Sequence, residues 1–498
     1  MRPNLTEDAF VALARTYSVV PVSIEILGDR ETPVSVYEKL VGQQNGFLLE
    51  SVEGGEQWAR WSFIGWEPRL SLVANDGVAT ATVDGGFKLP SLEGLDPLQA
   101  LEAVVDGFSS PPDDELGLGG AVPPLVAGAV GFLGYDVVRY VEHLPGRPED
   151  DRGLPEMAWQ FFGSLAVVDR FRQTIRLVRN VFVDADPAAQ YRQAVADLAA
   201  VTERLGHSAP YSVRARPDFG NAPEPRSNMT RVDFENAVER AIEYIKAGDA
   251  FQIVPSLRLE VDFAGDAFEV YRALRMVNPS PFLFYLRHDD LAISGASPEL
   301  MTRARNGKAD SRPIAGTRPR GATPEEDHAL GEELLGDPKE RAEHVMLIDL
   351  ARNDLGRVCE FGSVEIEDLM VVERYSHVMH IVSGVSGRLR PGVGPIDLLR
   401  ATFPHGTVSG APKVRAMEII DELEPTARGP YAGAVGYIDF SGNVDTAIAL
   451  RTLVAANGKA WVQAGAGIVA DSDPALEYEE CLNKAAAVLA ALGGSADV

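Results

Sequence analysis

Cysteine is almost absent from this chain of 498 residues, which contains only Cys359 and Cys481. The two cysteines form no Cys-x-x-Cys pair, so the sequence indicates neither a zinc site built on cysteine pairs nor a disulfide framework. The N-terminus also lacks the basic and apolar pattern of a signal peptide. We therefore expect a cytoplasmic protein.

Long hydrophobic runs and positive charge are scarce as well. The longest uncharged stretch, residues 116–135, contains Pro123, Pro124 and several glycines, so it does not resemble a membrane-spanning helix. The chain has 46 Lys and Arg against 73 Asp and Glu, which gives a formal net charge of -27. So acidic a chain repels nucleic acid and anionic membranes, and we exclude both as principal partners. An anionic substrate would need a local positive site.

The hydrophobic residues, 45% of the chain, are enough for a large core. Strand patterns punctuated by Gly and Asp predict an antiparallel sheet near the N-terminus, at 46–50, 58–64, 70–73 and 79–83. Further strand patterns lie at 251–259 and 446–453. Pro, Arg, Asn and Ser gather at 209–229, which we interpret as a linker. It separates an N-terminal part, 20–208, from a C-terminal domain, 230–493.

Two predicted helices repeat the spacing Glu-x-x-Glu. The four carboxylates are those of Glu340, Glu343, Glu477 and Glu480, and Lys484 shares a helix face with the second pair. In isolation such a face is more often a solvated surface. Two helices that each present two carboxylates can also enclose one Mg²⁺, because this cation prefers oxygen ligands. The spacing alone leaves both interpretations open.

Five longer segments carry a resemblance to a known family: 313–321, 349–354, 406–413, 431–437 and 465–484. The chain resembles the chorismate-utilising enzymes, and most closely the large subunits of anthranilate synthases, from about residue 20 to about 490. The resemblance implies an α/β fold, an antiparallel two-sheet sandwich flanked by helices, with interleaved N- and C-terminal parts. It implies that chorismate and ammonia become anthranilate and pyruvate through aminodeoxyisochorismate, the first step of tryptophan biosynthesis.

The same resemblance implies roles for individual residues. For Mg²⁺ it implies Glu343 and Glu480, with Glu340 and Glu477 beside them, directly or through water. For chorismate it implies Gly316, Thr317, Tyr431, Arg451, Gly465, Ala466, Gly467 and Lys484. Glu299 matches the general acid that assists loss of the C4 hydroxyl, and His380 matches the residue of the second step, in which pyruvate leaves. His405 is a weaker candidate that we leave out of the catalytic set.

Two positions discriminate between family members. Relatives that add water to chorismate carry a lysine where this chain has Gln252, and a neutral amide cannot act as that base. Relatives that make 4-amino-4-deoxychorismate carry a nucleophilic lysine where this chain has Ala315. Both positions favour amination at C2. The alternatives are aminodeoxychorismate synthase component I and, from a different class, a catalytically inactive protein that binds tryptophan for regulation.

The resemblance further implies feedback inhibition by tryptophan. Its pocket would contain Glu50 and Ser51 on one wall and Pro281, Phe282 and Leu283 on the other. From the residues alone, a strand end followed by a turn is the simpler interpretation of the first wall. Neither cysteine lies in a glutaminase-type motif. We therefore expect a separate glutamine amidotransferase subunit to supply ammonia. The resemblance implies a heterotetramer of two large and two small subunits.

Overall fold

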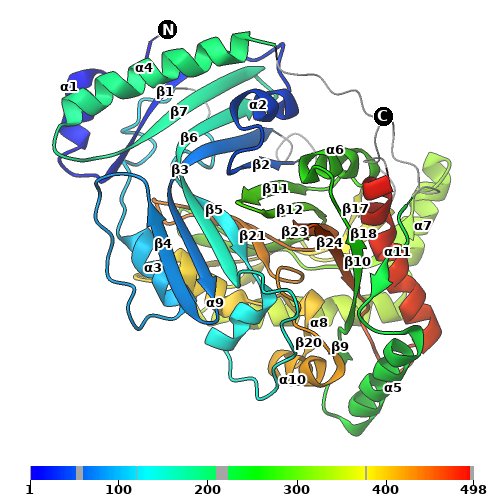
Figure 1. The fold of residues 1–498 in the computed structure, drawn as a ribbon. Coiled ribbons are helices and arrows are strands. Elements are labelled where there is room, and N and C mark those ends of the chain that lie inside the picture. The colour runs from blue at the N-terminus through cyan, green and yellow to red at the C-terminus, as the bar shows by residue number, and fades with distance from the viewer. Residues whose placement is uncertain (1, 52–59, 120–121, 209–221, 376–377, 494–498) are drawn as a thin grey trace.

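The computed structural model describes residues 2–51, 60–119, 122–208, 222–375 and 378–493. They form a mixed α/β structure in which helices cover the outside of a strongly curved sheet (Figure 1). All pairings between the named strands of this described part are antiparallel. The α/β class expected from the resemblance is therefore confirmed.

Strands dominate the N-terminal part. They are β1 (Val19–Leu27), β2 (Gly46–Glu50), β3 (Trp61–Asn75), β4 (Val78–Val83), β5 (Gly128–Leu133), β6 (Met157–Asp169) and β7 (Thr174–Phe182). Its helices are α1 (Glu7–Leu13), α2 (Pro33–Leu40), α3 (Pro97–Asp106), η1 (Tyr135–Tyr140) and α4 (Pro187–Gly206). The patterns at 58–64 and 70–73 belong to one strand, β3, which bulges between Pro68 and Leu70 without ending. Residues 58 and 59 lie outside the described residues.

The C-terminal part alternates helices with short strands. Its helices are α5 (Arg231–Ala247), α6 (Ala267–Val277), α7 (Pro324–Gly336), α8 (Pro338–Gly356), α9 (Pro395–Thr402), η3 (Gly406–Val408), α10 (Lys413–Leu423) and α11 (Pro474–Gly493). Its first strands are β8 (Arg226–Ser227), β9 (Gln252–Ile253), β10 (Ser256–Asp262), β11 (Phe282–His288), β12 (Leu291–Ser297), β13 (Leu300–Arg305), β14 (Lys308–Ser311) and β15 (Ile314–Pro319). The later ones are β16 (Glu365–Ile366), β17 (Val371–Arg374), β18 (Val378–Val382), β19 (Val385–Arg388), β20 (Gly410–Ala411), β21 (Ala434–Asp439), β22 (Val444–Ile448), β23 (Thr452–Ala456) and β24 (Lys459–Gly465). None of the helices in the described ranges has the length and apolar character needed to cross a membrane.

Two strands predicted for the C-terminal part are interrupted, and both interruptions lie near the candidate site. The pattern at 251–259 divides into β9 and β10 around Pro255, which has no N–H to donate to a ladder. The pattern at 446–453 divides into β22 and β23 around Arg451. Arg451 has a φ of 48°, in the left-handed region that side chains other than glycine rarely adopt. The prediction of a continuous strand was wrong at both places.

The two parts of the chain share one sheet. Strand β2 pairs with β11, and β5 pairs with β21, so N-terminal strands are inserted among C-terminal ones. This confirms the predicted interleaving. The proposed division at 209–229 stays a prediction about function, and residues 209–221 of that linker lie outside the described residues.

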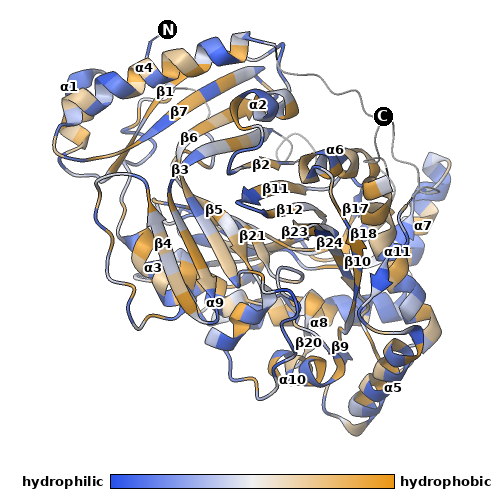
Figure 2. Cartoon of the chain, viewed as in Figure 1, coloured by the Kyte–Doolittle hydropathy of each residue, from blue (hydrophilic) through white to orange (hydrophobic). Residues whose placement is uncertain are grey.

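The core has an inner layer and two outer layers. Buried residues from both parts meet inside the curve of the sheet, among them Phe47, Phe162, Phe284 and Trp461. The outer layers lie between the sheet and its helices. Figure 2 shows hydrophilic and hydrophobic residues alternating along α4 and α5, as expected for helices with one buried face. This layering matches a sandwich flanked by helices.

Candidate active site

Strands β15 and β18 bring three predicted site residues together. A bulge in β15 lies between Ala315 and Thr317, and Gly316 there has a φ of 64°. The imidazole Nδ1 of His380, on β18, lies 2.9 Å from the Gly316 carbonyl oxygen and 3.1 Å from the Thr317 hydroxyl. Because a carbonyl oxygen only accepts, Nδ1 carries the proton and Nε2 carries the lone pair. Burial lowers the pKa of His380, so the ring is neutral at physiological pH.

Glu299 lies directly after β12, and its side chain is buried. Its Oε1 accepts a hydrogen bond of 2.8 Å from the Thr407 hydroxyl, and the Ile314 N–H also donates to the carboxylate. Burial raises the pKa of Glu299 to about 8, although these hydrogen bonds and the charges of Arg451 and Lys484 oppose the shift. The carboxyl group therefore holds a proton at neutral pH.

Arg451 and Tyr431 approach the same site from two further segments. The positive charge of Arg451 acts on both Glu299 and His380, so the guanidinium lies near both groups. The phenol oxygen of buried Tyr431 lies 2.8 Å from the position that a Cβ on Gly465 would take. A side chain at position 465 would therefore displace Tyr431.

The segment 465–467 connects these residues to α11. Lys484 Nζ donates to the Gly465 carbonyl at 2.9 Å and forms an ion pair of 2.7 Å with Glu480. Gly467 lies against the side-chain amide of Gln252. The Ala466 N–H donates to the Pro255 carbonyl at 3.2 Å. The contact of Ala466 with the substrate stays a prediction.

The four candidate metal ligands lie on α8 and α11. The Lys484 charge on α11 acts on Glu343, and the Lys339 charge on α8 acts on Glu477, so the two helices face one another. Burial raises the pKa of Glu343 and of Glu477, and the neighbouring carboxylates Glu340 and Glu480 raise them further. The mutual repulsion of these carboxylates and their all-oxygen donor set fit Mg²⁺.

The side chains as they stand are not arranged as a closed metal site. Within the described ranges, no group of three or more His, Cys, Asp or Glu residues is placed to hold a metal ion. Polar partners engage three of the carboxylates instead. Gln252 donates to Glu343 at 3.1 Å, Arg318 pairs with Glu340 at 3.3 Å, and Lys484 pairs with Glu480. These contacts would have to loosen for a cation to bind.

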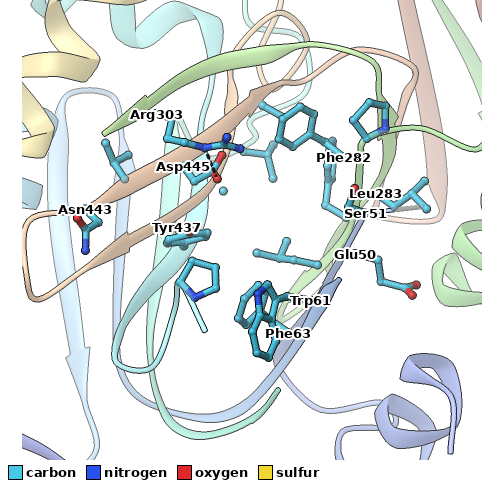
Figure 3. A pocket seen from close by; sticks show the side chains of 18 of the residues that line it. Glu50, Ser51, Trp61, Phe63, Phe282, Leu283, Arg303, Tyr437, Asn443 and Asp445 are labelled. Atoms are coloured by element: carbon cyan, nitrogen blue, oxygen red, sulfur yellow. Dashed lines mark hydrogen bonds and ion pairs between the residues drawn. The ribbon is translucent and has the colours of Figure 1, made fainter. Parts of the chain in front are cut away.

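The five residues predicted for an inhibitor site line one cavity of about 200 Å³ (Figure 3). Its further walls include Trp61, Phe63 and Tyr437, together with an ion pair of 2.7 Å between Arg303 and Asp445. Sequence reasoning missed these residues, although Tyr437 belongs to one of the segments that carry the resemblance. The cavity is bounded by strands from both parts of the chain.

Glu50 is held in the cavity wall by other side chains of the protein. Its carboxylate is fully buried, and Figure 3 shows it turned away from the cavity. It pairs with Arg170, lies 3.1 Å from Arg275 Nε, and accepts a hydrogen bond of 2.6 Å from Tyr271. With these partners the carboxylate ties the cavity wall to α6. Side chains of the protein itself therefore already hold this carboxylate, and direct contact of Glu50 or Ser51 with an inhibitor stays a prediction.

Comparisons with known proteins show the family to which the chain belongs. The family model for chorismate binding enzymes matches residues 46–490. Anthranilate synthase component 1 from Acetivibrio thermocellus is 44% identical, over 99% of this chain and 99% of that protein. Anthranilate synthase component 1 from Mycolicibacterium smegmatis (strain ATCC 700084 / mc(2)155) is 46% identical, over 99% of this chain and 94% of that protein. The crystal structure of anthranilate synthase component I from Streptococcus pneumoniae TIGR4 is 36% identical and covers 93% of this chain and 99% of its own, with a TM-score of 0.74.

Proposed function

The chain belongs to the chorismate binding enzymes and, among them, to the anthranilate synthase component 1 group, and we propose that it converts chorismate and ammonia into anthranilate and pyruvate. One observation carries the catalytic assignment. Strand β15 contacts both an acid and a base, because Ile314 donates to the Glu299 carboxyl group and Gly316 accepts from His380. A protonated carboxyl group and a neutral imidazole thus share one site.

In the proposed first step, the nitrogen of ammonia forms a bond to C2 of chorismate. The ring double bonds shift, the C4–O bond breaks, and the leaving hydroxyl takes a proton from Glu299 to depart as water. Hydroxide is a poor leaving group, so this proton lowers the barrier. Arg451 suits one of the substrate's carboxylates, since a guanidinium can bind a carboxylate through two parallel hydrogen bonds. The product of this step is aminodeoxyisochorismate.

In the proposed second step, Nε2 of His380 removes the C2 proton. The C3–O bond breaks, the ring becomes aromatic, and enolpyruvate leaves and takes up a proton to become pyruvate. The Gly316 carbonyl holds the imidazole so that Nε2 keeps its lone pair. The bulge in β15 therefore selects the tautomer that can act as the base.

We propose Mg²⁺ as the cofactor, held by Glu343 and Glu480 with Glu340 and Glu477 beside them. When bound, it supplies positive charge that neutralises a carboxylate of the substrate. This charge explains how a chain with a net charge of -27 can bind a dicarboxylate. Lys484, which already contacts Glu480 and the Gly465 carbonyl, adds a second positive charge.

Two side chains favour ammonia and C2 as the reacting partners. Gln252 donates an amide hydrogen to Glu343, and as a neutral amide it cannot act as the base that would activate a water. Ala315 is buried in β15 opposite Ile381 and offers no amine for a covalent intermediate. We further propose that a separate glutamine amidotransferase subunit supplies the ammonia in the cytoplasm, in a heterotetramer of two large and two small subunits.

Tryptophan is the proposed ligand of the 200 Å³ cavity, where it would act as a feedback inhibitor. The cavity wall is linked to the acid through strand pairing. Leu283 pairs with Glu50 across β11 and β2, and Phe282 pairs with Ser297 across β11 and β12. The Ser297 hydroxyl in turn lies 3.3 Å from the backbone of Glu299. A ligand that moves β11 can therefore move the acid.

Anthranilate fluorescence tests the proposed function. The purified chain is supplied with chorismate, Mg²⁺ and high ammonium at alkaline pH, then again with EDTA and with tryptophan. We expect a fluorescent product that EDTA and tryptophan each suppress. Consumption of chorismate without fluorescence would indicate a sister reaction, and untouched chorismate with folded protein would favour a regulatory binding protein.

A further inference from the structure

His405 is a buried histidine to which the proposed reaction gives no role. It caps the short helix η3, and its side chain is 7% exposed. Its Nδ1 lies 3.1 Å from the Thr407 hydroxyl and 3.6 Å from Oε1 of Glu299. The imidazole therefore lies directly behind the proposed acid, with one hydroxyl between them.

The protonation state of His405 follows from its surroundings. The backbone N–H of Thr407 points at Nδ1, at 3.4 Å, so Nδ1 carries a lone pair. Burial, together with the nearby charge of Lys413, lowers the pKa of His405 to about 3. The ring is neutral, and Nδ1 is a hydrogen-bond acceptor at every pH at which the enzyme would work.

The Thr407 hydroxyl has one proton and two acceptors within reach. It lies 2.8 Å from Oε1 of Glu299 and 3.1 Å from Nδ1 of His405. When Glu299 is ionised, the hydroxyl donates to the carboxylate, because charge-assisted bonds are stronger. When Oε1 carries a proton, it donates to the Thr407 oxygen, and the hydroxyl then donates to Nδ1. His405 thus completes the hydrogen bonds of the acid form only.

We propose that His405 is a positioning residue that acts through the Thr407 hydroxyl to keep Glu299 in its protonated form. After Glu299 gives up its proton, the hydroxyl turns from His405 to the new carboxylate. The proposal rests on the proposed function only where it concerns turnover, since the titration of Glu299 can be measured without any reaction.

Other charged groups near Glu299 and His405 act on these two residues equally in the wild-type protein and in the variants. Arg451 and Lys484 favour the ionised form of Glu299. Lys413 lies near His405, but it pairs with Asp354 at 2.7 Å and donates to the Thr402 carbonyl. Substitutions at His405 leave these four side chains in place, so their effect can be assigned to the lost acceptor.

The test compares two replacements of His405. Asn places its Oδ1 at the position of Nδ1 and keeps an acceptor, whereas Leu has a similar bulk and no acceptor. Infrared difference spectra would follow the protonated carboxyl band that is absent from E299Q, as a function of pH. We expect H405L to lower the pKa of Glu299 by about one pH unit, because the net free energy of one hydrogen bond corresponds to about that shift. H405N should shift this pKa less. Equal titration in H405L, H405N and wild type would overturn the proposal.

A second pair of variants, T407V and T407V/H405L, distinguishes an effect through the Thr407 hydroxyl from a general change in structure. T407V removes the donor to the carboxylate, so it should raise the pKa of Glu299, opposite in sign to H405L. In the double variant T407V/H405L, the change at His405 should have no further effect, because the connecting hydroxyl is gone. Additive shifts in the double variant would contradict the relay.

Turnover gives an independent readout. Rates are measured over pH at a constant concentration of free NH₃, so that the titration of ammonium does not contribute. The alkaline limb of kcat should move to lower pH in H405L by the same amount as the infrared titration. If neither the wild-type protein nor any variant makes anthranilate, the proposed function is wrong. The infrared titration still decides whether His405 affects the protonation of Glu299.

Discussion

The side-chain amide of Gln252 donates to a carboxylate oxygen of Glu343 at 3.1 Å. Position 252 is the one that, by the resemblance, discriminates the relatives that add water. The contact connects this position to Glu343, one of the two proposed principal metal ligands. The same amide lies against Gly467, in the segment proposed to face the substrate. One neutral residue thus adjoins both the proposed metal site and the proposed substrate site, and it brings no positive charge that would compete with Mg²⁺.

Removing the Glu343 charge should weaken Mg²⁺ binding. We expect E343Q to need a Mg²⁺ concentration at least about 10-fold higher for half-maximal activity, because hard cations bind carboxylates far better than amides. E479Q is the matched control, since Glu479 lies on α11 but pairs with Arg231 on the surface. Isothermal titration with Mg²⁺ gives the same comparison without turnover. Equal affinity in the two variants would contradict the metal assignment.

Replacing His380 should separate the two steps. In H380N the amide nitrogen can still donate to the Gly316 carbonyl, but no group replaces Nε2 as the base. We expect chorismate consumption to persist while anthranilate formation falls by about 10²- to 10⁴-fold, the usual contribution of a general base. Chromatography with mass detection would follow substrate, aminodeoxyisochorismate and anthranilate together. A proportional loss of both steps would argue against the proposed division of roles.

The acid should set an alkaline limit on activity. Burial raises the pKa of Glu299 to about 8, so the active, protonated form is present below this pH and is lost as pH rises through it. At constant free NH₃, kcat should therefore fall above about pH 8. E299Q should lose about 10²- to 10⁴-fold in rate at all pH values. A variant E299Q with near-normal turnover would show that the proton comes from elsewhere.

Filling the cavity should weaken inhibition with little effect on catalysis. In S51F an aromatic ring would occupy space proposed for tryptophan. We expect inhibition by tryptophan to weaken at least about 10-fold, which corresponds to a loss of about 1.4 kcal/mol of binding free energy. The kcat should stay within about two-fold of wild type. S91F, at an exposed loop position, is the control. Unchanged inhibition in S51F would place the inhibitor elsewhere.

Tryptophan and chorismate should also influence one another's binding. If the β2–β11–β12 pairing couples the cavity to Glu299, tryptophan must weaken chorismate binding by the same factor as chorismate weakens tryptophan binding. Titrations in both orders with the inactive E299Q variant measure this. Independent binding would leave the cavity without an allosteric role.

Local sequence signals predicted much of the secondary structure. Thr230 and Asp233, three positions apart, form a capping box at the start of α5, and Gly248 ends this helix with a φ of 92°. The strand at 46–50 is β2. These features depend on neighbours a few residues away, so the chain itself encodes them directly.

Features that depend on distant contacts could not be predicted in this way. Arg451 takes a left-handed conformation that its residue type disfavours. The carboxylate of Glu50 accepts a hydrogen bond from Tyr271, which lies 221 residues away in the sequence. The hydrogen bond from Thr407 to Glu299 joins residues 108 positions apart. No pattern in one segment indicates such partners, and the resemblance to a family named site residues without showing how they contact one another.

The identity of the nucleophile and of the attacked carbon is the most direct test of the proposed function. The purified chain would be incubated with chorismate, Mg²⁺ and ¹⁵N-labelled ammonium, and the products would be separated and analysed by mass spectrometry. We predict anthranilate that carries the ¹⁵N label in its amino group, together with unlabelled pyruvate. A labelled 4-amino product, or isochorismate formed from water, would contradict the assignment drawn from Gln252 and Ala315.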